Sequence, residues 1–526
     1  MKTIKVIGSV MVMAMVLLAG HYPDKQLSVL SAPAGSEYTV IRKGGITVIP
    51  NGRYLTPAGS SVEVAPHPYG LVVTDDGSVA VTANSGVSPL SISIIKGLQS
   101  SHPTVMQVPP GPSTDKGILA SVFMGLAVSP DQKMVYIAGG QTNKVYIFSM
   151  DDGKKLDSVD CSQDINGKNY PDGYIGDMVL GKDGRYLFAV DQTNFRLVII
   201  DARKRRVTGS VMVGRYPFGI ALSPDEKLVY VANVGMFAYQ KIDSIEEKSD
   251  YDHALKYPPF AYLSQEMKEG VTIDGVKVPG TGEPNVPESF SVWAVSVANI
   301  LHPVVVAKIK TGILVGEKVE GIPAIGGSSP NSMVATSKYV FVSNGNNDNI
   351  SVIDIKNNGI VKEIPLRLHE AVKHFRGVIP FGLAVSPDEK RLYVAESGIN
   401  AVGVIDIPSL TLAGHIPVGW FPSKLAITKD GKKLIVANAK GFGSGPNGGK
   451  NYKAGPEGTY IGCLMKGTVS VIDIPSDDQL TSYTQQVVRN NFNIGTLEDA
   501  RLARKDNPVP VYGGERSSPV KYIVCN

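Results

Sequence analysis

The stretch PFGLAVSPDEKRLYVAESG occupies residues 380–398, and residues 217–235 read PFGIALSPDEKLVYVANVG. Each copy contains a short apolar run, a polar turn built on Ser-Pro-Asp, and a second apolar run. Proline presets φ at the first turn position and aspartate accepts local hydrogen bonds, so each copy predicts a β-hairpin. Near-identical hairpins far apart in one chain are typical of a repeat architecture.

Five further copies make seven in total: PYGLVVTDDGSVAVTAN (68–84), FMGLAVSPDQKMVYIAGG (123–140), YIGDMVLGKDGRYLFAVD (174–191), SPNSMVATSKYVFVSN (329–344) and FPSKLAITKDGKKLIVAN (421–438). Equivalent positions are 41 to 55 residues apart, with one exception. The interval from Gly219 to Asn331 holds no further copy, so it predicts one unit with an insertion.

The second run of each hairpin is apolar on both faces. In RLYVAE, Leu392 and Val394 face one way, while Tyr393 and Ala395 face the other. A strand that is apolar on both sides must be covered on both sides. A sheet stacked between two other sheets satisfies this requirement.

Two further strands follow most hairpins, as in AVGVIDIPSLTLAGHIPVG (401–419) and FRLVIIDARKRRVTGSVMVG (195–214). Four-stranded sheets stacked radially hide their faces against each other, and closing the ring removes exposed edges. The sequence therefore predicts an all-β protein, a seven-bladed β-propeller of four-stranded antiparallel blades over residues 37–490. Residues 37–59 are expected to donate an outer strand to the last blade and close the ring.

Composition supports a folded chain but no polyanion-binding class. Of 526 residues, 43% are apolar and 19% charged, with a net charge of +4. This charge is small for the length. The three cysteines, Cys161, Cys463 and Cys525, cannot build a disulfide scaffold. A bridge between Cys161 and Cys463 and a pair of free buried thiols both remain open, and free thiols are the expectation.

The N-terminus predicts a secretory signal over residues 1–20. Lys2 and Lys5 precede an apolar run from Val6 to Ala19, which is short for a membrane span. His21 stands where a lipoprotein box requires cysteine, so we expect a periplasmic or extracellular protein without a lipid anchor. An uncleaved membrane anchor is the alternative.

The repeated pattern Pro-x-Gly-apolar-Ser-Pro-Asp-x-Lys-x-apolar-Tyr-Val-Ala-Asn resembles the YVTN-repeat, YncE-like propeller family. Several stretches are similar to the N-terminal propeller half of bacterial two-domain proteins in which a phosphoesterase domain of the alkaline phosphatase superfamily follows: LKYPPFAYLSQEMKEGV (255–271), GEPNVPESFSVW (282–293), GIPAIGGSSPNSMV (321–334), SNGNNDNISVID (343–354) and GPEGTYIGCLMKGTVSVIDIP (455–475). The resemblance covers residues 37–490. The tail, residues 491–526, resembles a linker and the opening strand of the second domain, SSPVKYIVCN (517–526).

The resemblance implies a phosphoesterase domain or separate subunit as partner. The metal-binding aspartates and histidines and the nucleophile of that domain have no counterpart in this sequence. We therefore expect no catalytic residue, metal or cofactor in this chain.

Strand order predicts where a ligand binds. Links from second to third strands, and from blade to blade, emerge on one rim, which we call the loop-rich rim; the Ser-Pro-Asp turns emerge on the other. The insertions 236–290 (fourth blade) and 439–466 (seventh blade) interrupt second-to-third links. The links between blades are expected at 97–122, 156–173, 310–328 and 364–379. Functional loops gather on one side of a rigid scaffold, although these loops could also simply cover the channel mouth.

Candidate ligand contacts on that rim are asparagines that end second strands and basic residues nearby: Asn233, Asn344, His374, Arg376, Asn438 and Lys440. Asparagine at such a position, including Asn84, also serves as a turn residue. His374, Arg376 and Lys440 are suited to an anion.

Three motif-like stretches do not support a more specific site. HEAVKHFRG (369–377) spaces its histidines five apart, not four as in H-E-x-x-H, and AKGFGSGPNGGKNYK (439–453) departs from the phosphate-binding pattern. RKRR (203–206) is expected at a hairpin tip on the opposite rim.

The sequence thus favours a secreted, non-catalytic binding or docking module. The alternatives are the propeller part of a phosphoesterase system and, more weakly, a DNA-binding protein.

Overall fold

The computed structural model describes residues 28–42, 44–240, 261, 263–319, 321–445 and 460–496. The predicted signal peptide, most of the predicted C-terminal tail and parts of both predicted insertions lie outside these residues.

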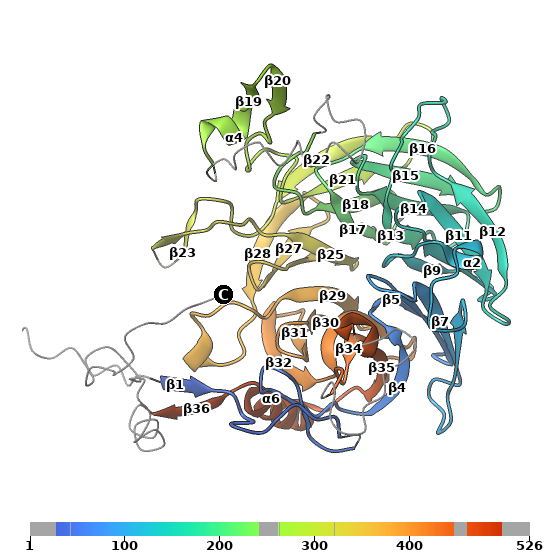
Figure 1. Ribbon diagram of the computed structural model, residues 1–526. Helices are drawn as coiled ribbons and strands as arrows, with labels where there is room; N and C mark the ends of the chain where they lie inside the picture. The colour runs from blue at the N-terminus through green and yellow to red at the C-terminus, as the bar shows by residue number, and fades with distance from the viewer. Residues whose placement is uncertain are drawn as a thin grey trace, which may run out of the picture.

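Seven four-stranded antiparallel sheets form the body of the protein, and Figure 1 shows them following one another around a ring. Blade one consists of β5 (Pro68–Val73), β6 (Val79–Asn84), β7 (Ser91–Lys96) and β8 (Thr104–Val108). Blade two consists of β9 (Leu126–Val128), β10 (Met134–Ala138), β11 (Lys144–Ser149) and β12 (Lys155–Asp160). Blade three consists of β13 (Ile175–Leu180), β14 (Tyr186–Asp191), β15 (Arg196–Asp201) and β16 (Arg206–Met212). Blades four and five are β17 (Pro217–Leu222), β18 (Leu228–Asn233), β21 (Ser291–Ser296), β22 (Val304–Lys310); β25 (Pro330–Ala335), β26 (Tyr339–Asn344), β27 (Asn349–Asp354), β28 (Gly359–Pro365). Blades six and seven are β29 (Pro380–Val385), β30 (Arg391–Glu396), β31 (Ala401–Asp406), β32 (Thr411–Pro417); β33 (Trp420–Ile427), β34 (Lys433–Gly441), β35 (Lys466–Asp473), β4 (Ser60–Pro66). The seven-bladed propeller is confirmed.

The strand that closes the ring is β4, which pairs with β35 and so completes the seventh blade from the N-terminal side. The prediction that an N-terminal strand closes the ring is confirmed. The prediction that this strand lies within residues 37–59 is wrong. That segment holds the short hairpin of β2 (Thr47–Val48) and β3 (Tyr54–Leu55). The closing strand follows it directly.

The core is divided into seven apolar clusters, one at each junction between neighbouring blades. In β30, Leu392 and Val394 pack against the fifth blade, and Tyr393 and Ala395 pack against the seventh. The two-sided apolar pattern predicted this division. Each sheet is therefore stabilised on both faces by burial of apolar surface.

The repeated turn is held by its own side chains. In the sixth blade, Asp388 Oδ1 accepts hydrogen bonds from Ser386 Oγ (2.6 Å) and Lys390 N (3.1 Å). Glu389 has a φ of +55°. The turns of this kind lie on the rim opposite the long links, so the repeat phrase forms scaffold.

The long links leave the blades on the loop-rich rim. The links expected at 310–328 and 364–379 lie at 311–329 and 366–379, and the other two expected boundaries need larger corrections. The expected link 97–122 contains β8, and the expected link 156–173 begins inside β12. These outer strands carry mixed exposed and buried residues, which hides them in the sequence. The links themselves are 109–125, with the short helix α2 (Lys116–Leu119), and 161–174.

Several helices and short strands lie outside the seven blades. The described part of the first insertion carries α4 (Gln265–Glu269), β19 (Gly270–Ile273) and β20 (Val276–Pro279); the second ends with α5 (Ile461–Leu464). Helix α6 (Asp477–Asn491) lies on β32, and β1 (Ser28–Ser31) pairs with β36 (Asn493–Thr496) beside it (Figure 1). The link 311–329 holds β23 (Lys318–Val319) and β24 (Ile322–Pro323), and the link 366–379 holds the short helix η2 (Glu370–Val372). In the described residues, no helix has the length and apolarity needed to cross a membrane.

Candidate functional site

Aromatic side chains occupy the loop-rich mouth of the central channel, where the inner strands begin. Phe123, Tyr174, Phe218 and Phe381 come from blades two, three, four and six. Their rings contact one another edge to face, with centroids 5.2 Å (Phe123–Tyr174), 5.9 Å (Phe123–Phe218) and 6.3 Å (Phe218–Phe381) apart. A ligand approaching the channel from this rim therefore meets packed aromatic rings.

An ion pair also crosses the channel. Lys424 on β33 lies with its Nζ 3.4 Å from Asp177 Oδ2 on β13, and blades seven and three stand on opposite sides of the ring. Asp177 is buried, and Lys424 is partly buried. Side chains therefore cross the channel, and the open groove on this rim lies farther out.

The three predicted asparagines are fully buried inside their blades. Each side-chain amide donates to the third strand: Asn233 Nδ2 to Ser291 O (3.2 Å), Asn344 Nδ2 to Ser351 Oγ (2.7 Å) and Asn438 Nδ2 to Ser470 Oγ (3.0 Å). These amides therefore lie in the blade interior, where they connect the second strand to the third by hydrogen bonds.

Lys440 lies apart from the other predicted basic residues, in the seventh blade. Its Nζ is 5.0 Å from the ring centroids of both Trp420 and Phe421. Burial lowers the pKa of Lys440. Phe421 in turn contacts Tyr69 edge to face at 6.2 Å. The ammonium group is held over aromatic faces, a favourable cation–π arrangement.

His374 and Arg376 come together in a groove of about 420 Å³ between the links 311–329 and 366–379. We call this the interlink groove. The side chains that define it are Ile313, Val319, Ile322, Ile325, His374 and Arg376. The groove therefore has an apolar wall from one link and a basic wall from the other.

One turn of the fifth blade, between β26 and β27, fixes both walls. Asn347 Oδ1 accepts a hydrogen bond from Ile313 N (2.7 Å), which holds the first link. The buried carboxylate of Asp348 accepts from Gly377 N (2.7 Å) and Ile379 N (2.9 Å), which holds the second. The groove is thus attached to rigid strands, as a preformed site should be.

Large apolar side chains are exposed around the groove. Ile322 and Ile325 are each 71% exposed, and Phe375 is 62% exposed. Single exposed apolar residues are ordinary, but a cluster at the edge of a groove marks an interaction surface. Sequence reasoning did not select Ile322 or Ile325; the available signal was isoleucine in a Gly- and Pro-rich link where turn residues would suffice.

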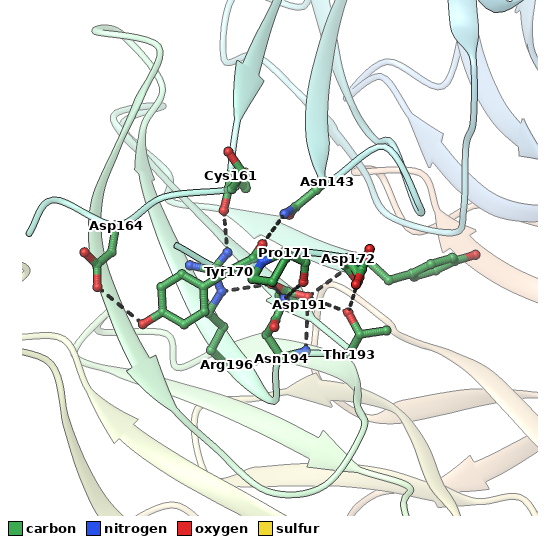
Figure 2. Close-up of polar contacts among 12 residues, drawn as sticks. Asn143, Cys161, Asp164, Tyr170, Pro171, Asp172, Asp191, Thr193, Asn194 and Arg196 are labelled. Carbon is green, nitrogen blue, oxygen red and sulfur yellow. Dashed lines mark hydrogen bonds and ion pairs between the residues drawn. The ribbon is translucent and has the colours of Figure 1, made fainter. Parts of the chain in front are cut away.

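The link 161–174 is anchored by a buried ionic cluster, shown in Figure 2. Arg196 Nε lies 2.8 Å from Asp191 Oδ2, and both side chains are fully buried. Arg196 also donates to the carbonyl of Cys161 and stacks with its Cζ 3.6 Å from the ring centroid of Tyr170. Burial raises the pKa of the Cys161 thiol to about 12, so that thiol is unreactive. Cys161 and Cys463 are both free and buried.

The basic RKRR stretch forms the hairpin tip between β15 and β16, away from the loop-rich rim. Arg205 Nη1 pairs with Asp157 Oδ2 at 2.7 Å, and Arg203 donates to the carbonyl of Asp183 at 2.9 Å. The ion pair of Arg205 neutralises one of the four positive charges of the stretch, and the hydrogen bond of Arg203 holds its guanidinium in place. Among the described residues, no group of three or more His, Cys, Asp or Glu side chains is placed to hold a metal ion.

Seven antiparallel blades around a braced channel define the class of the protein, a seven-bladed β-propeller. No family model and no curated protein matches the chain. Among solved structures, hydrazine synthase of Kuenenia stuttgartiensis is similar with a TM-score of 0.44 and 14% identity, covering 72% of this chain and 94% of that one. A similarity at this level carries no information about activity.

Proposed function

We propose that the protein is a secreted, non-catalytic propeller that docks a protein partner in the interlink groove. The observation that carries this proposal is the groove itself, a preformed apolar cleft walled by two links and bordered by His374 and Arg376. The partner contributes an apolar segment for Ile322 and Ile325 and acidic side chains for the basic wall.

Two features support docking of a protein segment. The exposed isoleucines are costly to leave in water, since full burial of such a side chain stabilises by about 1.5–3 kcal/mol. The channel mouth, the usual alternative in a propeller, is filled with aromatic rings. The partner that the family resemblance implies is a phosphoesterase domain or a separately encoded phosphoesterase subunit.

Site-specific photocrosslinking in the native cell tests the proposal. A photoreactive residue at Ile325 should give one discrete adduct, because this position is exposed in the groove. The matched control is the same probe at Lys390, an exposed residue of a Ser-Pro-Asp turn on the opposite rim. Equal labelling at both positions, or no adduct at position 325, contradicts docking in the groove.

The non-catalytic part of the proposal is tested separately. The purified chain should not hydrolyse p-nitrophenyl phosphate above the rate of buffer containing Zn²⁺ or Mg²⁺. Turnover that follows the protein through purification would show that this chain contains a phosphoesterase site.

A further inference from the structure

We propose a second site, an oxyanion pocket beside the interlink groove, which binds a phosphate or carboxylate group. The pocket lies between the β2–β3 hairpin, the link 366–379 and the end of α6. Three arginines, Arg53, Arg367 and Arg376, line it together with the rings of Phe375 and Phe492. None of the three guanidinium groups comes from a repeat phrase.

Arg53 is held in place by the surrounding backbone and a ring. Its Nη1 donates to the carbonyl of Gly398 at 2.6 Å, and its Cζ lies 5.1 Å from the ring centroid of Phe492. Burial lowers the pKa of the Arg53 guanidinium, although arginine still stays charged at neutral pH. A positioned, partly desolvated guanidinium binds an anion more strongly than a freely hydrated one.

Of the described residues that line the pocket, none carries a carboxylate, and two carboxylates bonded to or contained in the link 366–379 are already engaged. Asp348 accepts the two backbone hydrogen bonds that fix the link, and Glu370 pairs with Lys373. Within the described part of the chain, no carboxylate forms an ion pair with Arg53 or Arg376. The carbonyl end of α6 supplies about half a negative charge, which offsets only part of the two formal positive charges of Arg53 and Arg376.

The size of the pocket sets the ligand class. Its volume is about 50 Å³, which is enough for one oxyanion group. Arginine pairs with carboxylates and phosphates through parallel N–H donors. Arg376 also lines the interlink groove, so the remainder of a ligand can extend there. The inference concerns a small anion and does not require a protein partner in the groove.

Equilibrium dialysis of the full chain with radiolabelled inorganic phosphate at low ionic strength tests the pocket. We expect one saturable site, with affinity reduced about tenfold or more by Arg53→Gln and by Arg376→Gln, because each removes a charged donor. Arg376 is exposed, so its replacement leaves the fold intact. Arg53→Lys, which keeps the charge, should retain more affinity than Arg53→Gln.

The control is Arg185→Gln. Arg185 is an exposed arginine that also stacks on a ring, that of Tyr186 at 4.8 Å, but on the opposite rim. Competition with acetate separates the sources: weak displacement identifies a phosphate-bearing ligand, and strong displacement a carboxylate-bearing one. Absence of saturable binding of either anion, or binding that both glutamine variants leave unchanged, overturns the proposal. Either result leaves the crosslinking test at Ile325 unaffected.

Discussion

In six of the seven blades a buried polar side chain occupies the same position at or near the end of the second strand, and its identity determines how that strand is bonded to the rest of the blade. Four blades use asparagine: Asn84, Asn233, Asn344 and Asn438, all fully buried. The third blade uses Asp191, paired with Arg196, and the sixth uses Glu396, paired with His415. A neutral amide is satisfied by nearby hydroxyl and carbonyl groups, but a buried carboxylate needs a cationic partner.

Glu396 reaches its partner across the third strand because that strand leaves space. Gly403, two residues beyond Ala401, lies opposite His415 on the fourth strand, and a Cβ at Gly403 would lie 2.6 Å from Glu396 Oε1. The carboxylate therefore passes over Gly403, and His415 Nδ1 lies 2.6 Å from Glu396 Oε2. In the first, fifth and seventh blades serine occupies the position that corresponds to Gly403, namely Ser93, Ser351 and Ser470. In the fourth blade this position is Trp293, and Asn233 bonds to Ser291 instead.

The Glu396–His415 pair makes stability depend on pH. Burial alone lowers the pKa of His415, but attraction to Glu396 and the hydrogen bonds raise it overall. The pair's contribution is therefore complete below the ordinary histidine pKa of about 6.5 and is lost as the pH rises through the folded-state value. In Glu396→Gln the attraction is lost, and burial becomes the dominant effect on the pKa of His415, which it lowers. The stability of this variant should therefore fall as the pH drops below about 6.5.

Urea midpoints measured from pH 5.5 to 9 check this reversal of slope. At pH 6 we expect Glu396→Gln to cost about 3 kcal/mol, the scale of a broken buried pair. The exposed His369 provides the control, because His369→Gln should follow the wild-type profile. Parallel profiles for the wild type and Glu396→Gln would show that the pair is not ionic.

At the scale of the element, ring closure depends on the backbone conformation of the residue that precedes β4. Gly59, just before β4, has a φ of +70°, and a Cβ there would overlap the carbonyl of Val471 and lie 3.0 Å from Ile472 Cα. Gly167 has a similar φ of +77° with nothing within 4 Å. Gly167→Ala therefore costs only the backbone strain, about 1 kcal/mol.

Gly59→Ala should cost about 2–3 kcal/mol more than Gly167→Ala, because it also displaces β4 from β35. Urea unfolding of both variants measures the difference, and faster amide exchange in β35 (Lys466–Asp473) would locate it. Equal losses in the two variants would mean that β4 adjusts without leaving its partner strand.

The elements differ in how far the sequence predicts them. The hairpins are predictable because turn chemistry, as at Asp388, and two-sided apolar runs act locally. The outer strand β8 (Thr104–Val108) is not, because only one of its residues is fully buried. For the site, the sequence indicated His374 and Arg376 but not Ile322 or Ile325. Which links lie next to each other depends on long-range contacts, such as the hydrogen bonds that Asp348 accepts from the link 366–379. No local sequence pattern predicts such contacts.

At the scale of the whole molecule, the seven inter-blade cores join only neighbours, whereas the pair of Asp177 and Lys424 joins opposite sides of the ring. Lys424→Met would leave the buried Asp177 carboxylate without its cation. We expect a loss of about 1–3 kcal/mol, less than for a fully buried pair because Lys424 is partly exposed.

A double-mutant cycle isolates this cross-ring coupling. Asp177→Asn combined with Lys424→Met should recover part of the loss, because the amide has no charge to leave unpaired. The control pair, Lys429 and Asp75, also links two blades, at 2.8 Å, but its side chains are 75% and 63% exposed. Lys429→Met should therefore cause no measurable change, since exposed pairs contribute little. If Lys424→Met is equally silent, the pair of Asp177 and Lys424 contributes nothing measurable to the stability of the ring.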